Sequence, residues 1–376
     1  MITELLAAAL GVYACIYLLV SVIVAIGVKS LKSRELSGEL SNVSVVICAR
    51  NEEKIIRRSL DSMLNLDYPR NRLEILLVDD ESEDGTLDIF KEYAQRDGMF
   101  RVLSTAGEPR DLPGKQRALN LGISQSTGEI VLGTDADIAV KPGWIKAHLS
   151  AYLENVGIVG STTRVDVTSG KIFDRLQCRE LITKLAVAMG CAGLGLPVTP
   201  MGNNISFRRD AYEQVGGFSG MDVSIVEDMA LMNAIVKRTH YKLGWITDKK
   251  GVVISIPEKD FATFINQRMR WTHEVNDLSM IGKFMITMET LMFSAFVISL
   301  ALAPWNPLPV AVIPLAWIFG YYIILLPSQG YETNDLWYIP GVLLFQIVYS
   351  CVIGARIFSG NRKVVWKGRV YQSGQK

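Results

Sequence analysis

Long runs without charged residues constrain this chain more than any other feature. No Asp, Glu, Lys or Arg occurs from Leu5 to Val28, and a helix of that length crosses a hydrocarbon core of about 30 Å at about 1.5 Å per residue. A cleaved signal peptide is disfavoured, because the run is too long and is preceded by Glu4 with no basic residue. Lys29, Lys32 and Arg34 follow the run directly. We therefore predict a retained transmembrane anchor over residues 1–30, with the following domain in the cytoplasm.

The C-terminal region is also apolar. Charged residues are absent from Thr290 to Tyr331 and from Leu336 to Ala355, and Pro304 and Pro307 interrupt the first stretch. Residues 284–358 are therefore expected to form two or three membrane helices, from segments at Phe284–Ala303, Leu308–Leu326 and Leu336–Phe358.

The charges around these segments conflict with three complete crossings. The tail, residues 359–376, is basic and indicates the cytoplasmic side, whereas Glu332 and Asp335 suit an external loop. An odd number of crossings from a cytoplasmic domain would leave the tail outside. We therefore expect one segment to lie in the interface or to re-enter the membrane, and Phe284–Ala303 is the candidate because it contains Glu289.

Residues 40–275 have the composition of an α/β domain. Short β-branched runs alternate with helical patterns, which predicts a mostly parallel sheet with right-handed crossovers. Ligands of such sheets bind at the carboxyl ends of the strands. Polar clusters follow the expected strands at these ends: Arg50–Glu53, Asp79–Asp84 and Thr134–Asp137.

Charge and cysteine content exclude several classes of protein. The 39 basic and 38 acidic residues give a net charge of +1, which excludes a polybasic nucleic-acid binder, so no nucleic-acid partner is expected. The five cysteines form no Cys-x-x-Cys pair and the three histidines are scattered. Neither a disulfide framework nor a zinc site is expected.

Two pairs of acidic residues are candidates for chemistry. Asp135 and Asp137 point the same way in extended backbone, and such a pair suits Mg²⁺ or Mn²⁺ bound to a diphosphate, although a solvated turn is the simpler alternative. Glu227 and Asp228 precede a helical pattern, where acidic residues either favour the helix dipole or serve as a general base.

The order and spacing of these motifs closely resemble the family 2 glycosyltransferases with the GT-A fold, over about Val43 to Trp271. Membrane-embedded members include ceramide, hopanoid and carotenoid glycosyltransferases and, more distantly, the cellulose, chitin and hyaluronan synthases. The tail at Trp366–Tyr371 is similar to the terminus of the lipid-glycosylating branch. The matching motifs are Val45–Glu53, Leu77–Thr86, Gly114–Asn120, Thr134–Asp137, Gly202–Asn204, Gly216–Phe218, Glu227–Asp228 and Gln267–Trp271.

The resemblance implies an α/β GT-A fold, Rossmann-like with a mostly parallel sheet, between N- and C-terminal transmembrane helices. It also implies specific roles. Asp228 would be the general base, with Glu227 as the second candidate, although Val226 replaces the family's usual Thr. Asp137 would ligate the metal, and Asp135 would contact the ribose or the metal. Donor-binding residues would be Ala49, Arg50, Asn51, Glu53, Asp80, Lys115, Asp135, Gln267, Arg270 and Trp271, and acceptor-binding residues Asn203, Asn204 and Trp271.

The expected activity is inverting, metal-dependent transfer of a sugar from a nucleotide-diphosphate sugar, by resemblance a UDP-sugar, to the hydroxyl or phosphate of a membrane lipid. The amphipathic pattern Lys171–Met189 and the apolar stretch Cys191–Pro200 suit an acceptor presented at the membrane surface. We expect a multi-pass plasma-membrane protein with a cytoplasmic catalytic domain.

Three other functions fit the sequence less well. A processive polysaccharide synthase needs a polar conduit, for which the apolar segments offer almost no polar residue. A transporter should carry ionisable residues in its spans, and the apolar segments contain only Glu289 apart from Arg356 at the end of the last one. A catalytically inactive scaffold is disfavoured because all five expected site residues are present: Asp80, Asp135, Asp137, Asp228 and Arg270.

Overall fold

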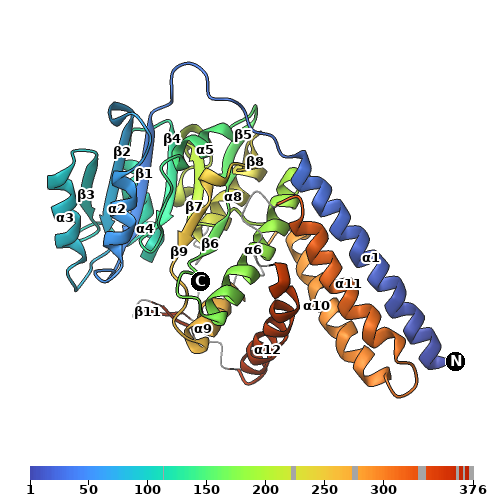
Figure 1. Ribbon diagram of the computed structural model, residues 1–376. Coiled ribbons are helices and arrows are strands. Elements are labelled where there is room, and N and C mark those ends of the chain that lie inside the picture. The colour runs from blue at the N-terminus through green and yellow to red at the C-terminus, as the bar shows by residue number, and fades with distance from the viewer. Residues whose placement is uncertain are drawn as a thin grey trace. The chain divides into compact units, whose positions relative to one another are not determined.

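The computed structural model describes residues 1–112, 114–221, 226–272, 278–328, 336–360, 364–366 and 369–371. The chain divides into two compact units (Figure 1), each built from separate stretches of sequence. The helical unit comprises Met1–Leu31, Ser169–Val198 and Leu278–Asn361. The sheet unit comprises Lys32–Thr168, Thr199–Asp277 and Arg362–Lys376.

The sheet unit is organised around one sheet whose described strands have the order β3-β2-β1-β4-β7-β5-β8. Strand β1 pairs in parallel with β2 and β4, and β7 is antiparallel to both β4 and β5. The expected mostly parallel α/β sheet is thus confirmed. The strands are β1 Val43–Ala49, β2 Leu73–Asp79, β3 Phe100–Ser104, β4 Ile130–Asp135, β5 Val156–Gly160, β7 Asn204–Arg208 and β8 Lys242–Trp245.

Helices cover this sheet because its central strands are apolar on both faces. Val45 and Ile47 lie on one face and Val46 and Leu76 on the other, and all four are fully buried. Gly122 lets α4 approach closely, since a Cβ there would lie 2.5 Å from a methyl group of Val46. The helices are α2 Ile56–Leu64, α3 Thr86–Arg96, α4 Gly114–Ser124, α5 Trp144–Ser150, α7 Arg209–Gln214, α8 Glu227–Arg238 and α9 Phe261–Thr272. Two small sheets pair β6 Thr163–Val165 with β9 Val253–Ser255, and β10 Val364–Trp366 with β11 Arg369–Tyr371.

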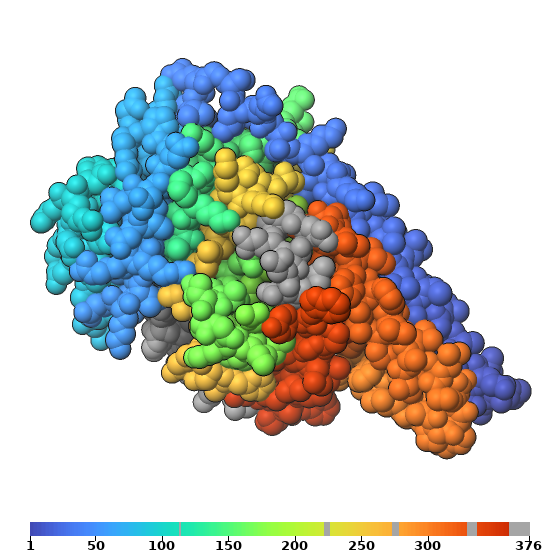
Figure 2. All heavy atoms as spheres, viewed as in Figure 1, coloured from blue at the N-terminus to red at the C-terminus, as the bar shows by residue number. Residues whose placement is uncertain are grey.

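The helical unit contains α1 Ile2–Ser30, α6 Ile172–Gly193, α10 Met280–Leu302, α11 Leu308–Leu325 and α12 Ile339–Phe358. Of the described helices, α1, α10, α11 and α12 are long and apolar enough to cross a membrane. The apolar segments predicted from sequence are therefore helices. Helix α1 packs against α10 and α11, and in the space-filling view α1 and α10 lie along each other (Figure 2).

Glu289 lies among these three helices with its carboxylate hydrogen-bonded. Its oxygens accept from the Trp317 indole N–H at 3.0 Å, the Tyr321 hydroxyl at 2.5 Å and the Tyr17 hydroxyl at 3.3 Å. Donors from α1 and α11 thus satisfy the one carboxylate of α10. The reason for expecting Phe284–Ala303 at the interface is thereby removed.

The units also differ from the domain boundaries expected from sequence. Residues 40–275 were expected to form one domain, but Ser169–Val198, which includes α6, belongs to the helical unit. Conversely, the tail from Arg362 belongs to the sheet unit, where β10 lies against α9. Apolar packing of α6, and the contact of the tail with α9, are long-range features that residue periodicity does not reveal.

Candidate active site

Three strands of the sheet end side by side. Ala49 at the end of β1 pairs with Asp79 of β2, and Cys48 pairs with Asp135 of β4. Because the strands are parallel, the polar loops that follow them emerge at the same edge. The sequence prediction that these clusters meet is consistent with this register.

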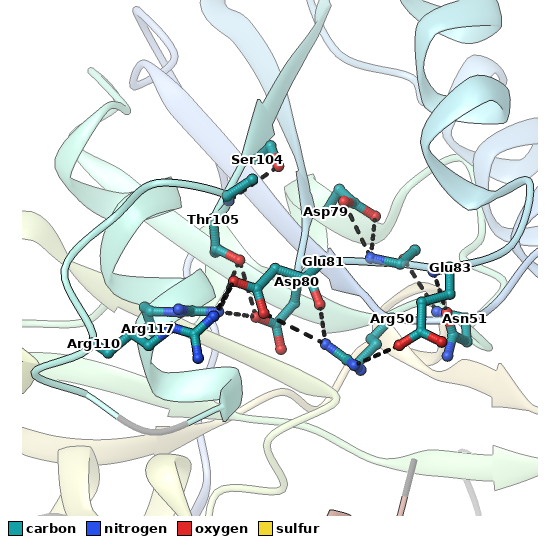
Figure 3. A network of polar contacts seen from close by, with 12 residues as sticks. Arg50, Asn51, Asp79, Asp80, Glu81, Glu83, Ser104, Thr105, Arg110 and Arg117 are labelled. Carbon is teal, nitrogen blue, oxygen red and sulfur yellow. Dashed lines mark hydrogen bonds and ion pairs between the residues drawn. The ribbon is translucent and has the colours of Figure 1, made fainter. Parts of the chain in front are cut away.

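The loop after β2 contains a buried ion pair (Figure 3). Arg117 Nη2 and Thr105 Oγ1 each lie 3.0 Å from Asp80 Oδ1. The Arg117 and Asp80 side chains are only 8% and 7% exposed. Sequence reasoning assigned no role to Arg117, although it lies in the Gly114–Asn120 motif. Its partner Asp80 is therefore fixed in place by α4.

The expected donor-binding residues of the first loop join it to the second loop. The Arg50 guanidinium donates to the carbonyl of Asp80 at 2.8 Å. The Asn51 side chain accepts from the Glu83 amide at 2.8 Å, and the Glu53 carboxylate accepts from the Gly85 amide at 3.1 Å. A cavity of about 540 Å³ opens beside these contacts, lined by residues 51–55, Glu83 and Asp84. Asn51 adopts a positive φ of 55°, which Asn tolerates better than most residues.

Lys115 connects three elements that are distant in sequence. Its ammonium lies 2.6 Å from Asp135 Oδ1 and 2.7 Å from Glu227 Oε1. Burial lowers the pKa of Lys115, but the attraction of Asp135 and Glu227 outweighs burial and raises it above its usual range. The ammonium therefore stays charged and joins α4, β4 and the start of α8.

Asp228, the expected base, follows Glu227 at the start of α8. Its Oδ1 accepts from the Met229 amide at 2.9 Å. A Cβ on Gly202 would lie 2.7 Å from Asp228 Oδ2, so glycine leaves the space that this carboxylate occupies. Burial, reinforced by repulsion from Glu227 and opposed by Lys115, raises the pKa of Asp228 to about 6. A carboxylate with that pKa is suited to accept a proton near neutral pH.

Asp137, the expected metal ligand, accepts from Ser255 Oγ at 2.6 Å. Burial and repulsion from Asp135 raise its pKa. Among the described residues no group of three or more His, Cys, Asp or Glu side chains forms a complete metal site. The carboxylate oxygens of Asp135 and Asp137 are hard donors of the kind that Mg²⁺ and Mn²⁺ prefer, and their role as metal ligands stays a prediction. Ser255 was not anticipated, because β9 is far away in sequence.

Asn203 and Asn204 were both expected to contact the acceptor, and the structure distinguishes them. Asn203 accepts from Thr163 Oγ1 at 2.6 Å, and its carbonyl accepts from Thr134, the neighbour of Asp135. Asn204 is fully buried. Its amide group contacts Trp144, His148 and the carbonyls of Thr162 and Gly251. These partners hold Asn204 in place and position β7, and its expected contact with the acceptor stays a prediction.

Gln267, Arg270 and Trp271 lie on α9. The Gln267 amide donates to Glu258 at 2.8 Å and accepts from Arg268. The Arg268 guanidinium stacks over the Phe264 and Trp271 rings, with centroid distances of 4.2 and 4.0 Å. These contacts orient α9, while the donor-binding and acceptor-binding roles of Gln267, Arg270 and Trp271 remain predictions.

The sequence is similar to those of known glycosyltransferases. Residues 44–226 match the family profile described as glycosyl transferase family 2. The chain is 32% identical over 217 residues to a "Probable glycosyltransferase YdaM" of Bacillus subtilis, covering 57% of this chain and 50% of that protein. It is 28% identical over 199 residues to a "Beta-monoglucosyldiacylglycerol synthase" of Trichormus variabilis, covering 53% and 42%. The chain thus aligns with about half the length of these relatives.

A solved structure shares the fold. The "Mannosyltransferase PcManGT from Pyrobaculum calidifontis in complex with GDP-Man and Mn2+" superposes with a TM-score of 0.53 at 18% identity, covering 96% of this chain and 95% of that one. At this identity the likeness concerns the fold alone.

Proposed function

Since the chain carries a family 2 glycosyltransferase domain at residues 44–226, we propose that it transfers a sugar from a nucleotide-diphosphate sugar to a hydroxyl or phosphate of a membrane lipid, with inversion at the anomeric carbon. UDP-sugar is the proposed donor class. In this reaction the acceptor oxygen bonds to the anomeric carbon, the bond from that carbon to the diphosphate breaks, and the nucleoside diphosphate leaves.

The observation that carries the proposal is the environment of Asp228. Its carboxylate has a pKa of about 6 and is held by the backbone at the start of α8. Glu227 is engaged by Lys115 at 2.7 Å, so Asp228 is the better candidate to take the acceptor proton. The proton moves from the acceptor hydroxyl to an oxygen of Asp228 as the new bond forms.

The donor side is proposed to use the carboxylates at the end of β4. Asp137, with Asp135 beside it, would hold a Mg²⁺ or Mn²⁺ ion, whose charge stabilises the departing diphosphate. Lys115 already lies 2.6 Å from Asp135 and can offer its ammonium to a phosphate oxygen. Ala49, Arg50, Asn51, Glu53 and Asp80 would form the nucleotide pocket near the 540 Å³ cavity.

A lipid acceptor is proposed on two grounds. Four described helices are apolar and long enough to cross a membrane, and one relative is named a β-monoglucosyldiacylglycerol synthase. We place the protein in the plasma membrane with the sheet unit in the cytoplasm, in line with the basic residues that follow α1.

The test is product analysis with purified full-length protein in native lipid extract. A panel of labelled nucleotide sugars is supplied with Mg²⁺ or Mn²⁺, and release of nucleoside diphosphate identifies the donor. A single organic-extractable glycolipid is the expected product. A water-soluble ladder or a high-mass polymer would instead identify a processive polysaccharide synthase, and no transfer from any donor would contradict the proposal.

A further inference from the structure

Helix α6 is attached to the sheet unit at both ends. Thr168 and Thr199, which flank its segment of the helical unit, both belong to the sheet unit. Its first thirteen residues include Asp174, Arg175, Arg179, Glu180 and Lys184. A helix with this many charges does not lie across a hydrocarbon core, and a helix with both ends on one side crosses nothing. Helix α6 therefore lies at the membrane face occupied by the sheet unit.

Helix α12 packs along this charged part of α6. Near its start, the Tyr338 hydroxyl lies 3.2 Å from Arg175 Nη1. In its middle, Phe345 contacts Phe173 edge-to-face at 5.9 Å, and the Tyr349 hydroxyl donates to Glu180 at 2.9 Å. The first and middle thirds of α12 thus contact a helix whose two ends lie on the side of the sheet unit, while Gln346 in the middle third also accepts a hydrogen bond from Tyr321 of α11 at 2.8 Å.

The C-terminal end of α12 is kept on the side of the sheet unit by the short segment that follows it. Helix α12 ends at Phe358, and β10, in the sheet unit, begins at Val364. Six residues span at most about 22 Å, which is less than the hydrocarbon thickness of about 30 Å. Within the sheet unit β10 lies against α9. Both ends of α12 are therefore on the side of the sheet unit.

Helices α10 and α11 differ from α12, because they pack along α1. The Tyr13 hydroxyl donates to the Met288 carbonyl at the middle of α10. Gly320 of α11 admits Tyr17 of α1, whose ring would lie 2.4 Å from a Cβ at that position. Glu289 joins all three helices. Helices α1, α10 and α11 thus form the transmembrane bundle.

We propose that α12 does not cross the bilayer, but lies in the interface on the side of the sheet unit and docks the protein onto that leaflet. With α10 and α11 as the C-terminal crossings, their number is even, and the basic tail returns to the side of the sheet unit. The conflict between the tail charge and three crossings then disappears, with α12 rather than α10 as the interfacial segment, and Glu332 and Asp335 fall on the side of the sheet unit instead of in the external loop expected from sequence.

The exposed surface of α12 is suited to contact with lipid. Its exposed side chains include Leu344 at 63%, Val348 at 46% and Phe358 at 98% exposure, while its opposite face packs on α6 and its neighbours. An apolar face opposite a polar partner is the pattern of a helix seated at the headgroup boundary. The basic tail that follows would favour an anionic leaflet.

The first test is labelling of single-cysteine variants with a membrane-impermeant maleimide, in inverted and right-side-out vesicles. The five native cysteines are first replaced, and each variant must give a monodisperse full-length protein. Trp337→Cys tests the start of α12, where the side chain is 88% exposed. Trp305→Cys, 71% exposed between α10 and α11, controls for the outer face, and Lys91→Cys controls for the sheet unit.

The proposal expects Trp337→Cys to label with Lys91→Cys, from the sheet-unit side only. Labelling together with Trp305→Cys, from the opposite face, would overturn it. The labelling assay does not depend on glycosyl transfer. The proposed position of α12 can therefore be refuted while the proposed enzyme activity holds, and the activity can be refuted while the position of α12 holds.

If lipid prevents the maleimide from reaching residue 337, a second experiment measures how deep each helix lies in the bilayer. Spin labels are placed at Trp337, Leu344, Val348 and Phe358 of α12, and at Leu308, Leu315, Phe319 and Leu326 along α11, all exposed. Collision with oxygen and with a polar nickel complex reports depth in the bilayer. The α12 labels are expected to share one shallow depth, whereas the α11 labels pass through the centre. An α12 profile that also passes through the centre would refute an interfacial α12.

Discussion

Lys115 and Glu227 are 112 positions apart in sequence, yet Lys115 Nζ lies 2.7 Å from Glu227 Oε1. The same ammonium contacts Asp135 at 2.6 Å. One cation therefore links the strand that carries the proposed metal ligands to the helix that carries the proposed base. Loss of this cation should affect both halves of the reaction.

Asp228→Asn should reduce turnover by about 10²-fold or more, because the amide keeps the shape of the carboxylate but cannot take the acceptor proton. Donor affinity should persist, as measured by calorimetry with the nucleoside diphosphate. Glu227→Gln is the matched control at the neighbouring position. If Asp228→Asn lost donor affinity and kept its turnover, Asp228 would be a binding residue and Glu227 the candidate base.

The pH dependence of transfer should follow the ionisation of Asp228. The base works only when deprotonated, and its pKa is raised to about 6. kcat/KM should therefore be constant above that pH and fall about tenfold per unit below it. A profile measured from pH 4.5 to 8.5, with the same profile for Glu227→Gln, checks this. An acid limb centred near the ordinary Asp value would contradict a buried base.

Lys115→Gln should shift that acid limb to higher pH. The Lys115 charge opposes burial and lowers the pKa of Asp228, so its removal should raise that pKa further. Donor affinity should also weaken, since the proposed phosphate contact is lost. The measurement is the kcat/KM profile together with the donor Kd. Weaker donor binding with an unchanged acid limb would mean that Lys115 contributes to donor binding but does not affect the pKa of Asp228.

Chelation by EDTA should abolish transfer, and Mg²⁺ or Mn²⁺ should restore it, because Asp135 and Asp137 are the proposed ligands of a cation whose charge would stabilise the departing diphosphate. Asp137→Asn should lose activity while the melting temperature is kept. Ser255→Ala, which removes the 2.6 Å hydrogen bond to Asp137, should raise the metal concentration needed for half-maximal activity. Full activity in excess EDTA would remove the cation from the mechanism.

Arg117→Met should destabilise the sheet unit by about 3 kcal/mol, because it leaves buried Asp80 without its guanidinium partner. Arg110→Met is the matched control. Arg110 pairs with Glu81 at 3.1 Å but is 79% exposed, so its loss should cost less than about 1 kcal/mol. Thermal unfolding of the detergent-solubilised protein gives the comparison. Equal melting temperatures for the two variants would mean that the buried pair adds no stability.

The sequence by itself determined the features that depend on neighbouring residues. Charge-free runs identified the apolar helices, because crossing hydrocarbon requires an unbroken apolar stretch. Alternation of β-branched runs with helical patterns identified the parallel sheet, and parallel strands necessarily bring Arg50, Asp80 and Asp135 to one edge. The motifs from Val45 to Trp271 predicted the resemblance to family 2 glycosyltransferases, whose profile residues 44–226 match.

Tertiary structure decided what depends on pairing between distant segments. The periodicity of residues 171–189 does not reveal that α6 joins the helical unit, since an amphipathic face fits either a core or a membrane surface. Burial of Asn204 follows from the antiparallel placement of β7 between β4 and β5. Lys115, Asp135 and Glu227 come together only because α4, β4 and α8 converge, and Glu289 is satisfied only because α1 and α11 supply its donors. Contacts of this kind are set by packing across the whole fold, and no local pattern of residues encodes them.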